Sequence, residues 1–140
     1  MASARPAALL ASVALALLPG CGATPRPDLK SAPPPSASAT APADGITLAQ
    51  LGFRNGPAGA FSVPRTVVWT TSVDEPSGVT VVFSRPDAAV LADYLRRVLP
   101  GSGFVVTGDA RATATLTFTG YGWHGSFTGA GASSALILRP

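Results

Sequence analysis

Residues 120–125 read GYGWHG, which matches the pattern G-x-G-x-x-G of loops that bind the phosphates of a dinucleotide. Such a loop works only where its glycines follow a strand and open a helix, whose first N–H groups meet the pyrophosphate. It also requires an acidic residue about 20 positions further on. Here the next residues, SFTGAG, are not helical in character, and no Asp or Glu follows Asp109. The pattern therefore predicts a β-hairpin and no cofactor site.

In this hairpin, Gly120 and Tyr121 form a two-residue type II′ turn with glycine at the first central position. The predicted cross-strand pairs are Thr119 with Gly122, Phe118 with Trp123, Leu116 with Gly125, and Ala114 with Phe127. The last three pairs lie on one apolar face, so register and hydrophobic pattern agree. Gly125 leaves a gap in that face, which we expect a helix side chain such as Tyr94 or Leu95 to fill.

The residues that could perform catalysis are few and scattered. His124 is the single histidine, and the hairpin turns it to the face opposite Trp123, towards solvent. A nucleophilic triad needs an activated serine and an orienting acid, and zinc needs three or four ligands. The adjacent Asp74 and Glu75 precede Pro76 in a predicted turn, which favours solvent exposure over paired acid–base catalysis. We expect no catalytic residues, no metal and no enzymatic activity; an envelope hydrolase would require acidic or histidine side chains that converge in a cleft.

Threonine recurs at alternate positions in ATATLTFT (112–119), which places a row of hydroxyls on one side of a strand. One interpretation is an ordinary wet face, because threonine is a good strand residue. The other is a contact surface, on which hydroxyls bond a polysaccharide or another envelope component. The candidate partner-contact residues on this second interpretation are Thr115, Thr117, Tyr121 and His124.

The elements that position these residues follow from local patterns. Segments 66–73 and 78–84 are β-branched and aromatic, and the intervening residues have turn chemistry. Ser84 and Asp87 have capping-box spacing before an amphipathic helix over 86–99, with Pro86 in its first turn. Strands follow at 103–108 and 112–119 and in the last 20 residues. The predicted order is β-β-α-β-β-β-β: an α+β fold with an antiparallel sheet of five to six strands and one helix on one face. Residues 46–63 fit either a helical turn or an edge strand.

Composition divides the chain into a folded part and a leader. All ten aromatic residues follow residue 50, so the core must be built from the C-terminal part, a single domain over 44–140. That domain has seven arginines against six acidic residues, scattered along the chain. A nucleic-acid-binding protein normally concentrates its basic residues on one face. We therefore expect no nucleic-acid partner.

The N-terminus begins MASARPAALLASVALALLPGC, an apolar run after one arginine. As a helix, the twelve residues 7–18, which are apolar except for Ser12, span about 18 Å. This length is well short of the ~30 Å hydrocarbon core, which favours an export signal over a membrane span. Leu18-Pro19-Gly20-Cys21 resembles the lipobox of bacterial lipoproteins. This resemblance implies a signal peptide over 1–20, lipid attachment at Cys21 and an extracytoplasmic domain anchored to the cell membrane. A plain secreted protein with an incidental cysteine is the alternative.

Residues 22–43 contain six prolines and no aromatic residue. Such a segment cannot bury enough apolar area to fold, so we expect a disordered tether. The lipobox, this tether and the pattern YLRRVLPGSGF…LTFTGYGWHGSFTG together resemble the small envelope lipoproteins of high-GC actinobacteria. The sequence leads to two functional hypotheses: a non-enzymatic binding module for an envelope partner, most simply a protein, and a carrier of a small hydrophobic ligand held between helix and sheet.

Overall fold

The computed structural model describes residues 40–140. The predicted signal peptide (1–20), Cys21 and residues 22–39 of the predicted tether lie outside the described residues. Between residues 40 and 140 the chain forms strands and one α-helix in the following order: β1 (Gly45–Thr47), β2 (Ser62–Pro64), β3 (Val68–Glu75), β4 (Gly78–Arg85), α1 (Ala88–Val98), β5 (Val105–Ala110), β6 (Thr115–Gly120), β7 (Trp123–Ala130) and β8 (Ser133–Arg139). Short 3-10 turns follow α1 and β5, at Pro100–Ser102 and Arg111–Thr113.

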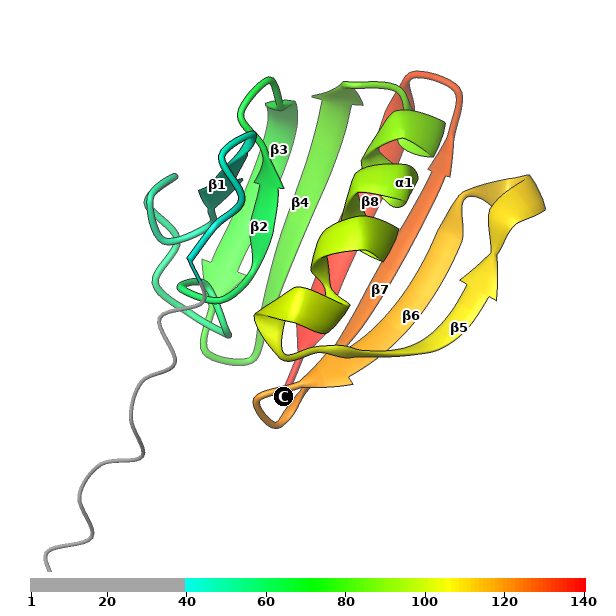
Figure 1. The fold of residues 1–140 in the computed structure, drawn as a ribbon. Helices are drawn as coiled ribbons and strands as arrows, with labels where there is room; N and C mark the ends of the chain where they lie inside the picture. The colour runs from blue at the N-terminus through cyan, green and yellow to red at the C-terminus, as the bar shows by residue number, and fades with distance from the viewer. Residues whose placement is uncertain (1–39) are drawn as a thin grey trace, which may run out of the picture. The chain divides into compact units, whose positions relative to one another are not determined.

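The six longer strands form one antiparallel sheet in the order β3-β4-β8-β7-β6-β5, and β1 pairs with β2 in a separate small sheet (Figure 1). Strand β4 ends near one edge, and α1 carries the chain across the sheet to the opposite edge. The chain then returns strand by strand until β8 pairs with β4. The predicted α+β architecture, with one helix on one face of an antiparallel sheet, is confirmed.

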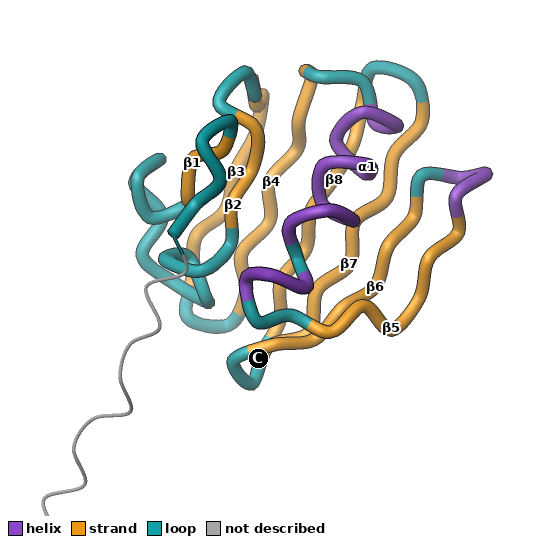
Figure 2. The backbone as a smooth tube through the Cα atoms, viewed as in Figure 1, coloured by secondary structure: helices purple, strands orange, loops and turns teal. Residues whose placement is uncertain are grey.

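One face of the sheet is covered by two elements rather than one. The helix presents Leu91 and Leu95, both almost fully buried, to the strands. The β1–β2 segment lies beside it on the same face of the sheet (Figures 1 and 2). This segment contributes Leu48, Phe61 and Val63 to the same core. Residues 46–63, for which helical turn and edge strand were both open, therefore contain short strand pieces at each end and turns between them. They extend the covering layer towards β3 and β4.

The start of α1 differs from the predicted capping box. Asp87 is the N-cap but makes no side-chain cap bond, and Pro86 precedes the helix instead of lying in its first turn. The Ser84 hydroxyl donates to the Val68 carbonyl of β3, 3.2 Å away. The N–H of Ala88 instead donates to the carbonyl of Gly131 in the β7–β8 turn, at 2.8 Å. A tertiary contact thus satisfies a helix N–H that the sequence pattern assigned to a local cap.

The predicted register of the central hairpin was wrong by two residues. The turn residues are Tyr121 and Gly122, both with positive φ (56° and 77°), as a type I′ turn requires. Phe118 therefore pairs with Gly125, and Leu116 with Phe127. Because the slip is even, every side chain stays on its predicted face. The gap at Gly125 is filled by the ring of Phe118 from the neighbouring strand, and not by Tyr94 or Leu95.

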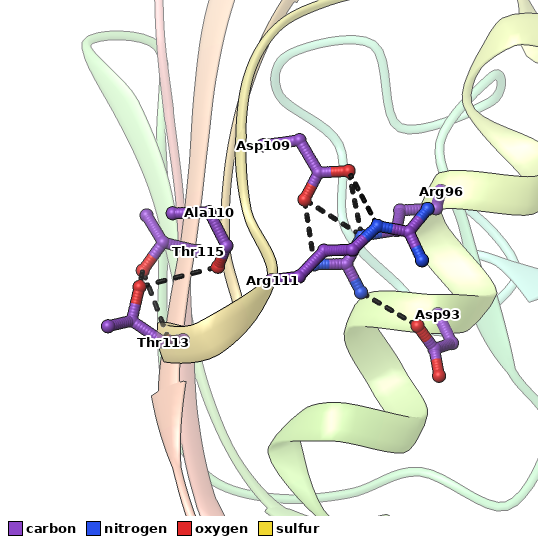
Figure 3. A network of polar contacts seen from close by, with 7 residues as sticks. All are labelled: Asp93, Arg96, Asp109, Ala110, Arg111, Thr113 and Thr115. Carbon is purple, nitrogen blue, oxygen red and sulfur yellow. Dashed lines mark hydrogen bonds and ion pairs between the residues drawn. The ribbon is translucent and has the colours of Figure 1, made fainter.

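Two ion-pair groups fasten α1 to its surroundings. Arg97 pairs with Asp44 and lies over the ring of Tyr94, so the start of the domain is held against the helix. On the other side, Arg96 bridges Asp93 on α1 and Asp109 on β5 (Figure 3). Its Nε donates to both Asp109 oxygens, at 2.9 and 3.0 Å. These pairs connect the helix to the start of the domain and to the edge strand β5 of the sheet.

The Arg96–Asp109 pair predicts a pH dependence of stability. Hydrogen bonding from the Arg96 guanidinium lowers the pKa of Asp109. A lowered folded-state pKa stabilises the fold at pH values above the unfolded value of about 3.9, and this contribution is lost as the pH falls through the folded value. We expect Asp109→Asn to reduce the difference in free energy of unfolding between pH 7 and pH 3, measured by urea denaturation. Arg96→Met should reduce it similarly, and an unchanged difference in both variants would contradict this role.

Candidate functional site

The GYGWHG stretch is the tip of the β6–β7 hairpin, and its glycines open no helix. Tyr121 is fixed there by two contacts. Its hydroxyl donates to the Ser102 carbonyl at 2.7 Å, and its ring packs edge-on against Phe104 with centroids 5.2 Å apart. The side chain thus connects the hairpin to the segment after α1, although Tyr121 remains 49% exposed. These contacts place Tyr121 apart from the other three candidate contact residues.

Thr115, Thr117 and His124 lie together on the face of the sheet that α1 does not cover. The pairing of Thr119 with His124 and of Thr117 with Ser126 sets their side chains side by side. Thr117 and His124 are exposed and Thr115 is half-buried. The structure therefore brings three of the four sequence-predicted contact residues onto one surface.

This surface, which we call the outer face, extends across all six strands of the sheet. Its central row runs through hydroxyl and β-branched side chains in register: Val73 with Thr80, Thr80 with Ile137, Ile137 with Ser126, and Ser126 with Thr117. The next row contains Thr71, Val82, Ala135 and Thr128. No strand or helix within residues 40–140 lies over these rows (Figures 1 and 2).

Ionisable groups enter the outer face at one end. His124 lies opposite Arg139 on β8, and Arg139 approaches Gly78, whose partner on β3 is Glu75. The rest of the face is hydroxyl-bearing or aliphatic. Some of these hydroxyl groups already form hydrogen bonds within the sheet, since Thr107 Oγ1 donates to Thr117 Oγ1 at 3.0 Å. The chemistry available here is hydrogen bonding and close packing on a nearly uncharged surface, rather than proton transfer.

Asp74, the first residue of the acidic pair beside the turn, has a structural role. The Asp74 carboxylate accepts hydrogen bonds from the backbone N–H groups of Arg54 and Asn55, at 2.7 and 3.0 Å, and from the Asn55 amide at 3.1 Å. Burial acts to raise the pKa of Asp74, but these donors outweigh it and lower the pKa. The carboxylate therefore attaches the loop at 54–55 to β3. Within residues 40–140, no group of three or more His, Cys, Asp or Glu side chains is placed to hold a metal ion.

The space between α1 and the sheet, where a carried ligand would lie, is filled by side chains. Leu95, Phe118, Leu136 and Leu138 are each at most 1% exposed there. The hollows that the described residues line open to solvent; one of about 440 Å³ lies beside Tyr94 and Arg97, and one of about 150 Å³ beside Phe53 and Trp69. Each is a surface feature outside the core.

Sequence reasoning predicted the strand beside the second of these hollows, but it missed the hollow and the position of that strand at the sheet edge. Trp69 lies on β3, remains 37% exposed, and meets Phe53 edge-on with centroids 6.4 Å apart. The run VVWTTSV has the same pattern as the other strands of the sequence. It lies at the sheet edge because β4, its one neighbour between residues 40 and 140, pairs on the other side with β8. The one local signal of the hollow was Trp69, which is the single aromatic residue of segment 66–73.

None of the helices between residues 40 and 140 has the length and apolar character needed to span a membrane. A scan against models of protein families, a search of curated proteins and a search of solved structures each found no match to this chain.

Proposed function

We propose that residues 44–140 form a non-enzymatic binding module, held at the outer side of the cell membrane by lipid on Cys21, and that its partner is a protein of the cell envelope. The observation that carries the proposal is the outer face, a sheet surface six strands wide with few charges. Depletion of charged side chains characterises the centre of protein interfaces. The face also exposes apolar area, such as Val73 at 45%, and exposed apolar area favours contact with another molecule.

The composition of the outer face favours a protein over a polysaccharide. Its β-branched and hydroxyl side chains stand in regular rows, the arrangement by which sheets pack face to face about 10 Å apart. Its rows contain no tryptophan, since Trp69 and Trp123 both turn to the covered side with the core. A second sheet or a flat helical surface fits such rows. A cell-wall component bound through the hydroxyls of Thr115 and Thr117 is the other outcome that the test below separates.

The anchor rests on the sequence alone. An apolar run of signal-peptide length ends at Leu18-Pro19-Gly20-Cys21, and Cys21 is the single cysteine of the chain. The carrier hypothesis gains no support, because side chains fill the region between α1 and the sheet that its ligand would need.

Site-specific photo-crosslinking in living cells tests the proposed partner surface. We expect a benzophenone amino acid at Thr117 to give a discrete protein adduct, and the same group at Ala89, exposed on α1, to give none. Ser126→Lys, adjacent to Thr117, should lower the adduct yield about tenfold, because burying an unpaired ammonium costs more than 1 kcal/mol. An adduct with glycan would favour the cell-wall alternative. Equal yields at Thr117 and Ala89 would refute the proposal.

A further inference from the structure

Strand β3 forms one edge of the six-stranded sheet and is unusually open. Seven of its eight residues are exposed, including Val73 at 45%, and its one sheet neighbour within residues 40–140 is β4. The opposite edge is different, because β5 has an irregularity between Val106 and Gly108 and its Asp109 is held by Arg96. Natural sheets usually protect edge strands with lysine, proline or bulges. In β3 the irregular pairing is confined to its first residues, and the register is regular from Thr71 to Glu75.

The direction of the backbone groups follows from the hairpin that joins β3 to β4. Glu75 pairs with Gly78 across the two-residue turn Pro76-Ser77, so this closing pair exchanges both of its hydrogen bonds. Bonded and non-bonded pairs alternate along an antiparallel ladder, and Val73 and Thr71 therefore also bond to β4. The N–H and C=O groups of Ser72 and Asp74 consequently point away from the sheet. They form a short ladder that has no partner strand between residues 40 and 140.

A hollow of about 150 Å³ lies beside this ladder, on the covered side of the sheet. It is lined by Leu51, Gly52, Phe53, Trp69, Ser72 and Asp74. The hollow is open to solvent; its apolar part consists of Leu51, Phe53 and Trp69, and its polar part of Ser72 and Asp74. The Asp74 carboxylate at its border is already satisfied by Arg54 and Asn55. A side chain that enters from a strand placed against β3 can therefore pack its apolar surface on Phe53 and Trp69.

We propose that β3 receives an extended segment of a partner protein as a seventh, antiparallel strand. The residue opposite Ser72 places an aromatic or aliphatic side chain between Phe53 and Trp69, and a basic residue lies opposite the exposed carboxylate of Glu75. Main-chain bonds supply affinity in this mode and the side-chain hollow supplies specificity. The inference rests on the proposed function in one respect, that the partner is a protein, but it uses a different surface from the outer face.

A second copy of this chain fits the edge less well. In a two-fold antiparallel pair, the residues whose N–H and C=O groups point away from each sheet must lie opposite one another. Ser72 would therefore lie opposite Ser72 or Asp74 of the other copy. Either register brings a polar side chain to the hollow and leaves Phe53 and Trp69 uncovered. It also adds the acidic residues of a second β3 without adding a basic one from that strand. An extended segment with an apolar and a basic side chain meets both requirements.

The test uses a fluorescein-labelled hexapeptide, Lys-Thr-Val-Phe-Thr-Val, and the full-length chain in detergent, with binding followed by fluorescence anisotropy. The sequence places lysine opposite Glu75 and phenylalanine opposite Ser72. We expect saturable binding that weakens at least about tenfold when the peptide nitrogen of phenylalanine is methylated, because that N–H bonds to β3. Methylation of the first valine nitrogen, which points away from β3, should leave binding unchanged.

Matched variants of the chain test the same ladder. Ser72→Pro removes an outward N–H and keeps the bonds of Val73 and Thr71 to β4, a position where an edge strand tolerates proline. It should weaken peptide binding at least tenfold, whereas Ser72→Ala should not. The two methylated peptides decide the question even if Ser72→Pro fails to fold.

Three results would overturn the inference: no saturable binding of the hexapeptide, equal binding of both methylated peptides, or a dimer of the unmodified chain in sedimentation that Ser72→Pro abolishes. The last would identify a second copy as the occupant. Loss of peptide binding together with a persistent Thr117 adduct would leave the proposed function intact and reject the edge site. Saturable peptide binding without a Thr117 adduct would reject the outer face and leave the edge site intact.

Discussion

Gly125→Val is expected to lower the free energy of unfolding by about 3 kcal/mol, the upper end of the usual range for overpacking. A Cβ atom at Gly125 would overlap the ring of Phe118, which lies across the gap that the glycine leaves in β7. Phe118 cannot retreat, because Phe61 stacks on it at 5.6 Å and Phe104 meets it edge-on at 5.7 Å. Thermal denaturation followed by circular dichroism should show a melting temperature at least ~10 °C lower.

Gly101→Ala is the matched control for this change. Gly101 lies in the 3-10 turn after α1, and a Cβ atom there would meet no other atom within 4 Å. Its melting temperature should be unchanged or slightly raised, because alanine reduces the conformational entropy of the unfolded chain. If Gly125→Val melts at the same temperature as the unmodified protein, the packing of Phe118 over Gly125 is not as described.

Cys21→Ala is expected to move the protein from the membrane fraction to the soluble fraction. Two buried acyl chains hold a protein firmly, at about 0.8 kcal/mol per buried CH₂. The twelve-residue run Ala7–Leu18 is too short to replace them by spanning the bilayer. Fractionation followed by immunoblotting measures the change. Metabolic labelling with an alkyne fatty acid provides an independent readout, since the unmodified protein should carry the label and Cys21→Ala should not.

Ser36→Ala, in the same N-terminal region, is the control and should remain labelled and membrane-bound. Equal membrane partitioning of Cys21→Ala and the unmodified chain would reject the lipid anchor. The binding surfaces proposed for residues 44–140 would still be testable, because neither the Thr117 adduct nor peptide binding at β3 requires the lipid.

The element order and the faces of the strands could be predicted because they depend on local periodicity. Alternation in β6 assigns Leu116 and Phe118 to the core and Thr117 to the outer face without knowledge of any partner strand. The helical spacing of Leu91 and Leu95 likewise indicates the buried side of α1. Since three of the four candidate contact residues lie on strands, periodicity alone was enough to bring those three together.

Register and capping could not be predicted in the same way. A two-residue slip leaves every side chain on its face, so the hydrophobic pattern does not distinguish a turn at Gly120-Tyr121 from one at Tyr121-Gly122. The second places Tyr121 at positive φ, which costs roughly 1–2 kcal/mol. The bond from its hydroxyl to Ser102 and its packing on Phe104 offset that cost, and both contacts depend on the position of a segment nearly 20 residues away.

The amino-acid sequence by itself determined the six longer strands, the helix and the side of each that faces the core, because a chain with period-two and period-3.6 apolar patterns must bury those faces. Only the tertiary structure decided that β8 inserts between β4 and β7, which leaves β3 as an open edge beside Phe53 and Trp69 and the outer face as one continuous surface. Strands β4 and β8 are more than 50 residues apart in the chain, and their pairing forms only together with the rest of the sheet. No local sequence pattern specifies such a pairing.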